Sequence, residues 1–561
     1  MPQKSACIQC HTKKRRCGGQ IPVCDRCRRL SLDCHYPESR RKTGPKRAHL
    51  GPLFTKLAEI EETINIDSTY RPSSSIEQND ESSAGSREIM SVLDQNSLQP
   101  TNSLDLELGW MGSFLPVETE LPQESLSELC HIFFRDIHPT LPILHPSKYF
   151  HKKNLHKSDD GIRCLRYIVW SHAASVCESL SHMRDRFYEQ ARGYACANEM
   201  NDNVGISLIQ CQALVLISYY EYKHAIFPRA WLTAGKAMRL ALVLKLHRMD
   251  SGVHWNSTLD VSDEWVELEE RRRTFWSAFC VDSYSGFGGG FLSMTDESDI
   301  STYLPSEDEA FENDTIPKNV SHTLATALQL ETSRSLSSFG SAVVLSWLAA
   351  RTANHLRTQD DQKYWENHHV IDAQLLQISL SLPSHLKLPG GIHQPNVVLT
   401  NMLLHALTVS LHQAAVSKAT EDPVKKHLAW ESNMRCLTSA SEIANIVKEV
   451  TQSNLAAIHV LTPFCIFVAL RYLMTQPQRD APESKQTCQF LTDVLGSCVA
   501  KQNNLLAGLF LHARILQLEG QPVNQSVRRY LPAPKHNKNS SGCLILTGGV
   551  CHSFQKSRGS G

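Results

Sequence analysis

Six cysteines near the start of the chain constrain its fold more than any other feature of the sequence. They follow the spacing C-x(2)-C-x(6)-C-x(6)-C-x(2)-C-x(6)-C, two matched halves around a loop that contains Gly18, Gly19 and Pro22. A two-residue gap lets both sulfurs of a pair reach one zinc ion, and structural zinc takes four ligands. Six sulfurs fill two such sites only if two of them bridge. The cysteines are Cys7, Cys10, Cys17, Cys24, Cys27 and Cys34.

Two alternatives remain open for these cysteines, a disulfide-linked module and a mononuclear zinc knuckle with spare thiols. The other twelve of the eighteen cysteines are scattered singly from Cys130 to Cys551, which is typical of thiols in a reducing compartment. We therefore predict two zinc ions per chain as a structural cofactor. His11 and His35 stand next to cysteines, but the six sulfurs complete the ligand set, so we expect these histidines to contact phosphate or solvent.

Charge is divided unevenly along the chain, although the formal net charge is zero. Residues 1–47 hold 13 Lys and Arg against 3 Asp and Glu, a net charge of +10, which leaves 44 against 54, or −10, for the rest. A basic N-terminus on an acidic chain favours a polyanionic partner there. Four consecutive cations lie between the second and third cysteines, on a segment that metal would hold at both ends. They are Lys13, Lys14, Arg15 and Arg16.

Three features together resemble the fungal binuclear zinc cluster family: the cysteine spacing, the basic run before Cys17, and a proline two places before Cys24. The resemblance implies two short helices related by a pseudo-twofold axis. It also implies that Cys7 and Cys24 bridge the two ions. One site would be completed by Cys10 and Cys17, and the other by Cys27 and Cys34.

The same resemblance implies double-stranded DNA as the partner. Lys13 and Lys14 occupy the positions where the family reads a CGG triplet, Lys14 above all, and such side chains can donate to the O6 and N7 atoms of guanine in the major groove. His11 stands where the family usually has arginine, so one backbone contact is expected to be weaker. The remaining cations are expected to contact phosphate or stay solvated. They are Arg15, Arg16, Arg26, Arg28 and Arg29.

The chain after the cluster predicts a basic linker and a short coiled coil. Residues 40–47, with Arg41 as a phosphate contact, combine cations with turn formers and together with residues 13–16 are typical of a nuclear import signal. Apolar residues then repeat at intervals of three and four within residues 48–66, as in a coiled-coil seam. We expect a homodimer through residues 50–66; packing of this segment within one chain is the alternative. The seam residues are Leu50, Leu53, Leu57, Ile60 and Ile64.

The rest of the chain predicts a large helical domain between a linker and a tail. Residues 67–120 are rich in serine and poor in aromatic residues, so they predict a disordered linker. Residues 121–520 are expected to be helical, and residues 521–561 to be a disordered tail. The fold class is thus a small zinc-stabilised N-terminal module plus a large all-α regulatory domain. Apolar periodicity, with starts at residues such as Ser125 and Ser262, predicts helices at 125–137, 162–180, 205–223, 229–246, 263–284, 397–417, 435–450 and 486–517.

Several segments of this helical region resemble the middle homology domain of the same fungal regulators. They lie at 133–145, at 231–248, and at 270–276, where Glu-Arg-Arg-Arg-Thr-Phe-Trp is the most specific. The resemblance spans about residues 125–475 and departs at 290–292, where Gly-Phe-Leu replaces the usual Gly-Arg-Pro. Acidic neighbours of Arg271, Arg272 and Arg273 favour a solvated or salt-bridged face over a second nucleic-acid site.

Other classes of function are disfavoured by the sequence. The segment 230–237 lacks the first glycine of a phosphate loop, the glycines at 286–290 lack the GxGxxG spacing, and HExxH and GxSxG are absent. The apolar run at 460–470 is too short to span a membrane, and no secretory signal begins the chain, so a soluble nuclear protein is expected. We predict a DNA-binding regulator of RNA polymerase II genes that meets co-regulators and is open to a small-molecule effector. The alternative is a zinc module that binds proteins without reading DNA.

Overall fold

The chain forms two compact units in the computed structural model, residues 1–100 and residues 101–561. No strand occurs among the residues that the structure describes. The predicted coiled coil at 48–66, most of the linker at 67–120 and the tail at 521–561 lie outside these residues. The described residues are 6–36, 120–155, 159–200, 206–252, 259, 264–289, 297–317, 322–327, 336–421, 426–453, 458–476, 481–502, 504–508 and 510.

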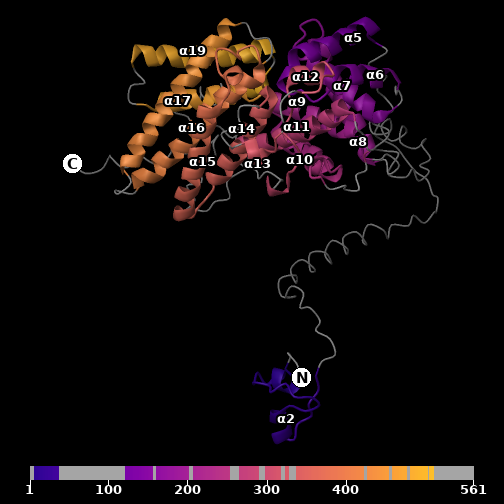
Figure 1. The fold of residues 1–561 in the computed structure, drawn as a ribbon, viewed down its shortest axis with the longest axis vertical. Helices are drawn as coiled ribbons and strands as arrows, with labels where there is room; N and C mark the ends of the chain where they lie inside the picture. The colour runs from indigo at the N-terminus through magenta and orange to yellow at the C-terminus, as the bar shows by residue number, and fades with distance from the viewer. Residues whose placement is uncertain are drawn as a thin grey trace, which may run out of the picture. The chain divides into compact units, whose positions relative to one another are not determined.

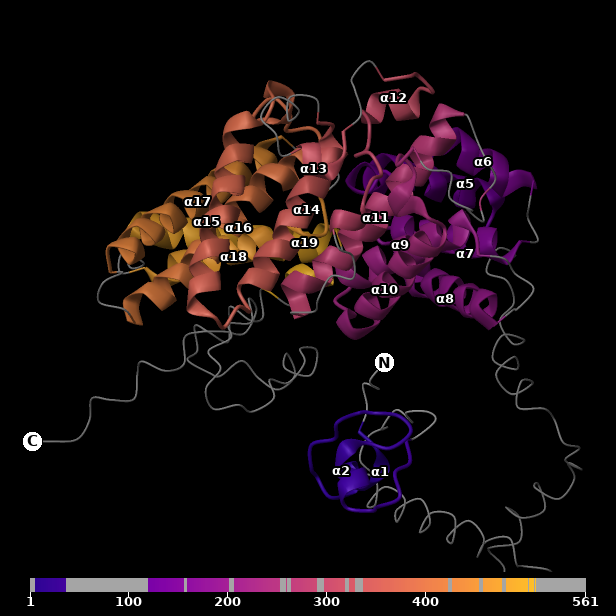
Figure 2. The same ribbon diagram turned by 60° about the horizontal axis from the view of Figure 1, so that its bottom comes forward.

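The N-terminal unit contains two short helices, α1 (Ile8–Thr12) and α2 (Asp25–Arg29). Figure 2 shows them side by side, enclosed by the loops that connect them. Cysteines supply the buried residues of this unit, with Val23, Leu32 and Tyr36 packed against them. Helices of five residues are far too short to be stable alone, so the unit depends on what its cysteines bind.

The second unit is built from two helical halves that pack on each other through α11 and α14 (Figure 1). In the first half, consecutive helices pair side by side, α7 with α8 and α9 with α10. Its helices are α5 (Gln123–Ile132), α6 (Pro146–Leu155), α7 (Asp160–Ala174), α8 (Arg184–Met200), α9 (Leu208–Lys223), α10 (Phe227–Val243) and α11 (Trp265–Gly289).

The second half centres on the long pair α16 and α17, which α14 and α18 cover. Among the described residues, none of the helices combines the length and the apolar character needed to cross a bilayer. The short helices α12 (Asp308–Glu312) and α13 (Leu324–Ala327) lie between the halves in the chain. The helices of the second half are α14 (Ser338–His355), α15 (Asp361–Ser381), α16 (Pro395–Glu421), α17 (Lys426–Gln452), α18 (Thr462–Thr475) and α19 (Pro482–Gln502).

Side chains just before several helices fix where they begin. The Asp159 carboxylate accepts hydrogen bonds from the amides of Gly161 and Ile162 at the start of α7. Ser207 and Gln210 form a reciprocal capping box at the start of α9. Such caps satisfy amides that have no partner within the helix and each contribute about 1 kcal/mol.

Each of the eight predicted helices overlaps a helix of the structure, but several boundaries were wrong. Helix α17 begins at Lys426 rather than at residue 435, and α7 ends at Ala174 rather than at residue 180. Ser125 does not start a helix, because α5 begins at Gln123, directly after Pro122 in extended conformation. The prediction of one helix over 486–517 was also wrong. Helix α19 ends at Gln502, and the Asn504 side chain accepts a hydrogen bond from the amide of Ala507 at 3.2 Å, which begins a new turn.

The three arginines of the 270–276 motif form ion pairs, as expected, but they are largely buried rather than solvated. Arg271 pairs with Glu267 at 2.6 Å, and Arg272 pairs with Asp250 at 2.6 Å. Arg273 is 0% exposed. These guanidinium groups are therefore engaged within the protein, which favours the salt-bridged interpretation of this face of α11.

Arg273 connects α11 to segments that arrive from distant parts of the chain. Its guanidinium contacts Glu269 at 2.9 Å and Asp308 at 2.7 Å, and donates to the carbonyl oxygen of Ser306 at 2.7 Å. Asp308 in turn accepts a hydrogen bond from Ser338, the first residue of α14. One buried cation thus joins the first half of the unit to the start of the second.

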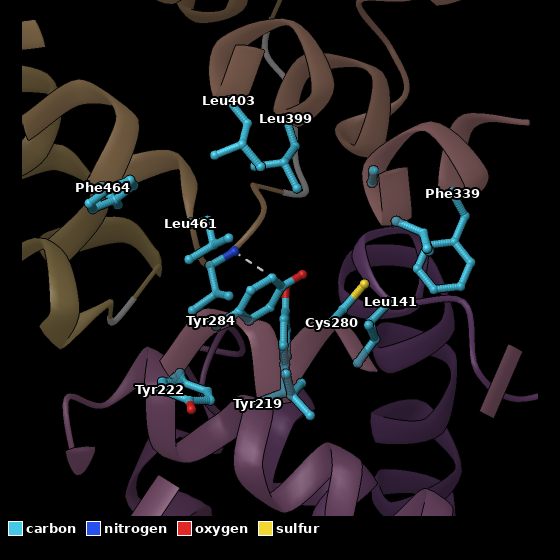
Figure 3. Packing of buried hydrophobic residues seen from close by; sticks show 14 of the residues in the cluster. Leu141, Tyr219, Tyr222, Cys280, Tyr284, Phe339, Leu399, Leu403, Leu461 and Phe464 are labelled. Carbon is cyan, nitrogen blue, oxygen red and sulfur yellow. Dashed lines mark hydrogen bonds between the residues drawn. The ribbon is translucent and has the colours of Figure 1, made fainter. Parts of the chain in front are cut away.

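Tyrosine hydroxyls form a second link between the halves (Figure 3). The Tyr219 hydroxyl donates to Thr140 Oγ1 at 2.9 Å and accepts from the amide of Val460 at 3.2 Å. His459 Nδ1 accepts from the amide of Leu461, so its Nε2 donates to the Tyr284 hydroxyl at 3.2 Å. Burial lowers the pKa of His459 to about 3, so its imidazole ring stays neutral at physiological pH.

We expect Arg273→Met to destabilise the helical unit by about 3–5 kcal/mol, because it leaves the fully buried carboxylate of Glu269 without its closest cation and also breaks the ion pair with Asp308. Urea unfolding of the full chain, followed by circular dichroism, measures this change. Arg135→Met is the matched control, since the Arg135 side chain is 72% exposed and, among the described residues, forms an ion pair with its neighbour Asp136 alone. The control should lose less than about 1 kcal/mol. Equal losses in the two variants would contradict the structural role given to Arg273.

Candidate metal centre and nucleic-acid interface

The six clustered cysteines form two groups of four sulfurs, each compact enough to hold one metal ion. Cys7 and Cys24 belong to both groups. The first group is completed by Cys10 and Cys17, and the second by Cys27 and Cys34. Four of the six are fully buried, and Cys17 and Cys34 are partly exposed.

The distances between sulfurs fit tetrahedral zinc. A Zn–S bond of about 2.3 Å in a tetrahedron separates neighbouring sulfurs by about 3.8 Å. The separation is 3.8 Å between Cys7 and Cys24, the two shared sulfurs. It is 3.8 Å between Cys10 and Cys24 in the first group, and 3.7 Å between Cys7 and Cys27 in the second. The donor set and its spacing therefore suit two zinc ions.

Protonation of the cysteines makes metal binding depend on pH. A hydrogen bond from the Cys27 amide lowers the pKa of Cys24 to about 6, whereas burial raises the pKa of Cys10 to about 11. The hydrogen bond and burial thus shift the pKa values of these two thiols in opposite directions. Zinc binds the thiolate form, so its binding releases protons and weakens as the pH falls.

The backbone around the sulfurs repeats with an offset of 17 residues. Helices α1 and α2 have five residues each and follow Cys7 and Cys24 directly. The Cys7 amide donates to Cys17 Sγ at 3.5 Å, and the Cys24 amide donates to Cys34 Sγ at 3.3 Å. Two residues beyond each helix, a side-chain-bearing residue adopts a left-handed backbone. These residues are Lys14 and Ser31, both with φ of 46°.

The basic segment of the first half is exposed to solvent. Lys13 follows α1, and the run continues to Arg16, next to the ligand Cys17. None of the four cations pairs with a carboxylate among the described residues. Hydrogen bonds from the Lys14 amide to His11 O at 3.0 Å and from the Arg15 amide to Cys10 O at 2.9 Å hold the backbone. A fixed backbone with free cationic side chains is suited to contact a polyanion.

Charge breaks the symmetry between the two halves. The positions 17 residues after the basic run carry Leu-Ser-Leu-Asp, at 30–33, in place of Lys-Lys-Arg-Arg. Leu30 is 54% exposed in the place that corresponds to Lys13. The two halves share a backbone, but only the first presents four consecutive cations. This asymmetry follows from the 17-residue repeat and could have been read from the sequence.

The other predicted positions lie either at the surface of the module or outside the residues that the structure describes. His11, His35, Arg28 and Arg29 are exposed, and Arg26 is half-buried. Arg41 and the rest of the 40–47 linker lie outside the described residues.

The sequence analysis did not identify Tyr36, which contacts Cys17 of the first sulfur group and Gln20 in the loop that follows Cys17. The Tyr36 hydroxyl lies 3.7 Å from Cys17 Sγ and donates to Gln20 O at 2.9 Å. A signal was available, because Tyr36 is the only Phe, Trp or Tyr within residues 1–47 and stands two places after the last ligand.

Comparison with known families agrees with this geometry. Residues 5–43 match the fungal Zn(2)-Cys(6) binuclear cluster domain, and residues 130–369 match the fungal specific transcription factor domain. The chain belongs to the fungal binuclear zinc cluster transcription factors. The family prediction and the fold class are confirmed, and the domain implies two zinc ions and binding to DNA. Membership of this family argues against an enzyme. The second match ends within α15, whereas the helical unit continues through α19.

Relatives that match most of this chain are transcriptional regulators as well. The citrinin biosynthesis transcriptional activator of Monascus purpureus is 27% identical, over 85% of this chain and 87% of the relative. The azaphilone cluster-specific transcription factor of Aspergillus niger is 27% identical, over 74% and 87%. The sorbicillinoid biosynthetic cluster transcription factor 1 of Penicillium rubens is 23% identical, over 91% and 92%. No solved structure matches the chain.

We expect two zinc ions per chain, and loss of the folded cluster when a chelator removes them, because zinc binding supplies about 10–16 kcal/mol in small structural sites. Elemental analysis counts the ions, and protease sensitivity of residues 6–36 reports the fold. Cys27→Ser should lose zinc, whereas Cys196→Ser, at an exposed cysteine of the helical unit, should keep both ions. A wild-type chain with one ion, or a protease-resistant module after chelation, would contradict the binuclear site.

Proposed function

We propose that this transcription factor acts in the nucleus and reads CGG-type triplets through Lys13 and Lys14. The observation that carries the proposal is the exposed, unpaired basic run on a segment held between two zinc ligands, Cys10 and Cys17. A lysine at a guanine edge donates to O6 and N7. Arg15, Arg16 and Arg41 are assigned to phosphates, which position the module without reading sequence.

The ligand assignment is part of this proposal. Cys7 and Cys24 would hold both ions, in keeping with their membership of both sulfur groups. With zinc bound, Cys10 and Cys17 would fix the ends of the basic segment, and the protein's own backbone directs the cationic side chains. The proposed DNA-binding domain covers residues 1–47, and the proposed regulatory domain covers residues 121–520.

The left-handed backbone at Lys14 supports a functional reason for lysine at this position. A residue with a β-carbon in this conformation costs about 1–2 kcal/mol relative to the right-handed region, and glycine or asparagine would be favoured there on stability alone. Ser31 has the same φ of 46° in the second half, without the basic run around it. The two halves thus provide a matched pair of positions for a test.

Exchange of the two side chains separates base reading from simple electrostatics. The double variant Lys14→Ser with Ser31→Lys keeps the composition, the net charge and both backbone conformations. We expect affinity for a CGG site to fall by about 1–3 kcal/mol, as for loss of one base contact, and affinity for random DNA to stay nearly unchanged. Fluorescence anisotropy with both DNAs at one fixed salt concentration measures the ratio of the two affinities.

If the exchange variant has the same ratio of affinities for the CGG site and random DNA as the wild type, base reading by Lys14 is ruled out. The alternative function, a zinc module that binds proteins without reading DNA, would then become the better interpretation. A fall on both DNAs to the same extent would instead assign Lys14 to a phosphate contact. Zinc content should stay at two ions in every case, because neither position is a proposed ligand.

We also propose that the chain binds DNA as a homodimer through the coil at residues 50–66. The support is the apolar repeat of that segment, since a seam with this spacing pairs helices side by side. Leu57→Asp together with Ile60→Asp places charges in the seam, where desolvation opposes pairing. Affinity for a site with two triplets should fall about tenfold or more, as avidity is lost, while affinity for a single triplet stays unchanged. Equal losses on both sites would indicate packing within one chain.

The proposed targets are genes of a secondary-metabolite biosynthetic cluster transcribed by RNA polymerase II. The relatives named above are regulators of citrinin, azaphilone and sorbicillinoid clusters, and they match this chain over most of its length. We assign contacts with co-regulators, or with a small-molecule effector, to the helical unit, because the citrinin regulator matches 85% of this chain, far more than the cysteine module alone could supply. Genome-wide binding combined with transcript changes on deletion identifies the genes.

A further inference from the structure

The two partly exposed sulfurs of the cluster differ in their surroundings. Cys17 and Cys34 each accept one backbone hydrogen bond, from Cys7 and Cys24 respectively. Cys17 Sγ is also 3.7 Å from the Tyr36 hydroxyl. Seventeen residues before Tyr36 the chain has Gly19, so the repeat offers no matching hydroxyl to Cys34. Among residues 6–36, Cys17 alone of this pair has a hydroxyl neighbour.

Tyr36 also brings the end of the module back to the first half. Its hydroxyl donates to Gln20 O at 2.9 Å, in the loop after Cys17. One residue earlier, the carbonyl of His35 accepts from the amide of Ile8, the first residue of α1, at 2.9 Å. The chain therefore leaves the module beside the half that carries the basic run, although its last cysteine belongs to the second sulfur group.

The protonation state of a zinc-bound cysteine determines which atom donates in the contact between Tyr36 and Cys17. A zinc-bound cysteine is a thiolate and has no proton to donate. The tyrosine hydroxyl is then the only possible donor between these two atoms. Its single proton faces two acceptors, the sulfur of Cys17 and the carbonyl oxygen of Gln20. The hydroxyl thus links a metal ligand to the loop that follows it.

We propose that Tyr36 is a positioning residue whose hydroxyl hydrogen-bonds the Cys17 thiolate and fixes the C-terminal end of the DNA-reading segment. The proposal rests on the ligand assignment given above. Cys17 directly follows Arg16, so any freedom at this sulfur is transmitted to the cations before it. Partners that hold a metal ligand from outside typically change metal affinity 10–100-fold when they are removed. Tyr36 therefore makes the first zinc site more tightly held than its own four sulfurs would.

The test compares Tyr36→Phe with Gln20→Ala in the full chain. Tyr36→Phe removes only the hydroxyl and keeps the ring. Gln20→Ala disturbs the same loop, because it removes the hydrogen bond from the Gln20 side chain to Asp25, but it keeps the Gln20 backbone carbonyl that Tyr36 uses. The measurements are zinc per chain, the rate of zinc transfer to a chromogenic chelator, and the ¹¹³Cd NMR spectrum of the cadmium-substituted chain.

We expect Tyr36→Phe to keep two ions per chain and to release one of them about tenfold faster, with the other unchanged. One of two ¹¹³Cd resonances should move and the other should stay. The ratio of affinities for CGG and random DNA should fall, because the end of the reading segment is less fixed. Gln20→Ala should leave the release rates and both resonances as in the wild type.

Three results would overturn the role of Tyr36 while leaving the binuclear cluster intact. These are unchanged release and resonances in Tyr36→Phe, equal acceleration of both ions, and the same shift in Gln20→Ala. Equal acceleration would show a general contact of the fold, since a partner of Cys17 alone affects one site. A wild-type chain with other than two ions would overturn the ligand assignment itself, which distinguishes the two failures.

Discussion

The N-terminal unit depends on two cysteines that serve both halves at once. Cys7 and Cys24 lie 3.8 Å apart and belong to both groups of sulfurs. Because each group needs both of them, neither half can assemble its site without the other. The helices that follow these cysteines have five residues each and gain little stability of their own. The position of the exposed basic segment, residues 13–16, therefore depends on the metal ligands on either side of it, Cys10 and Cys17.

The N-terminal unit has a symmetric backbone but an asymmetric distribution of charge, which under the proposed function gives it one DNA-facing side. The repeat of 17 residues extends to the backbone, including the left-handed residues Lys14 and Ser31. The side chains at corresponding positions differ, because residues 13–16 are Lys-Lys-Arg-Arg and residues 30–33 are Leu-Ser-Leu-Asp. Tyr36 adds a further difference, because it returns the end of the module to the first half. Fold and function are thus set by different residues of one repeated scaffold.

Buried polar groups, as well as the apolar core, join the two halves of the helical unit. Arg273 lies at the meeting point of α11, the segment before α12, and the start of α14. Tyr219 and Tyr284 reach the residues that precede α18. Because each of these groups loses its hydration on burial, each must find its partner for the two halves to close. The arrangement of the halves is therefore specific rather than merely compact.

The amino-acid sequence by itself determined the binuclear site, the family, the helical class and most long helices, since these follow from local spacing. It missed α6, α8, α14, α15 and α18. The residues of α14 and α18 are buried almost all round and therefore show no apolar stripe. It predicted a solvated or salt-bridged face for the arginines of α11; the ion pairs are present, but Arg273 is 0% exposed. Burial, the partners of Arg273 and the contact of Tyr36 with Cys17 were decided only by the tertiary structure, because each depends on which distant segments meet.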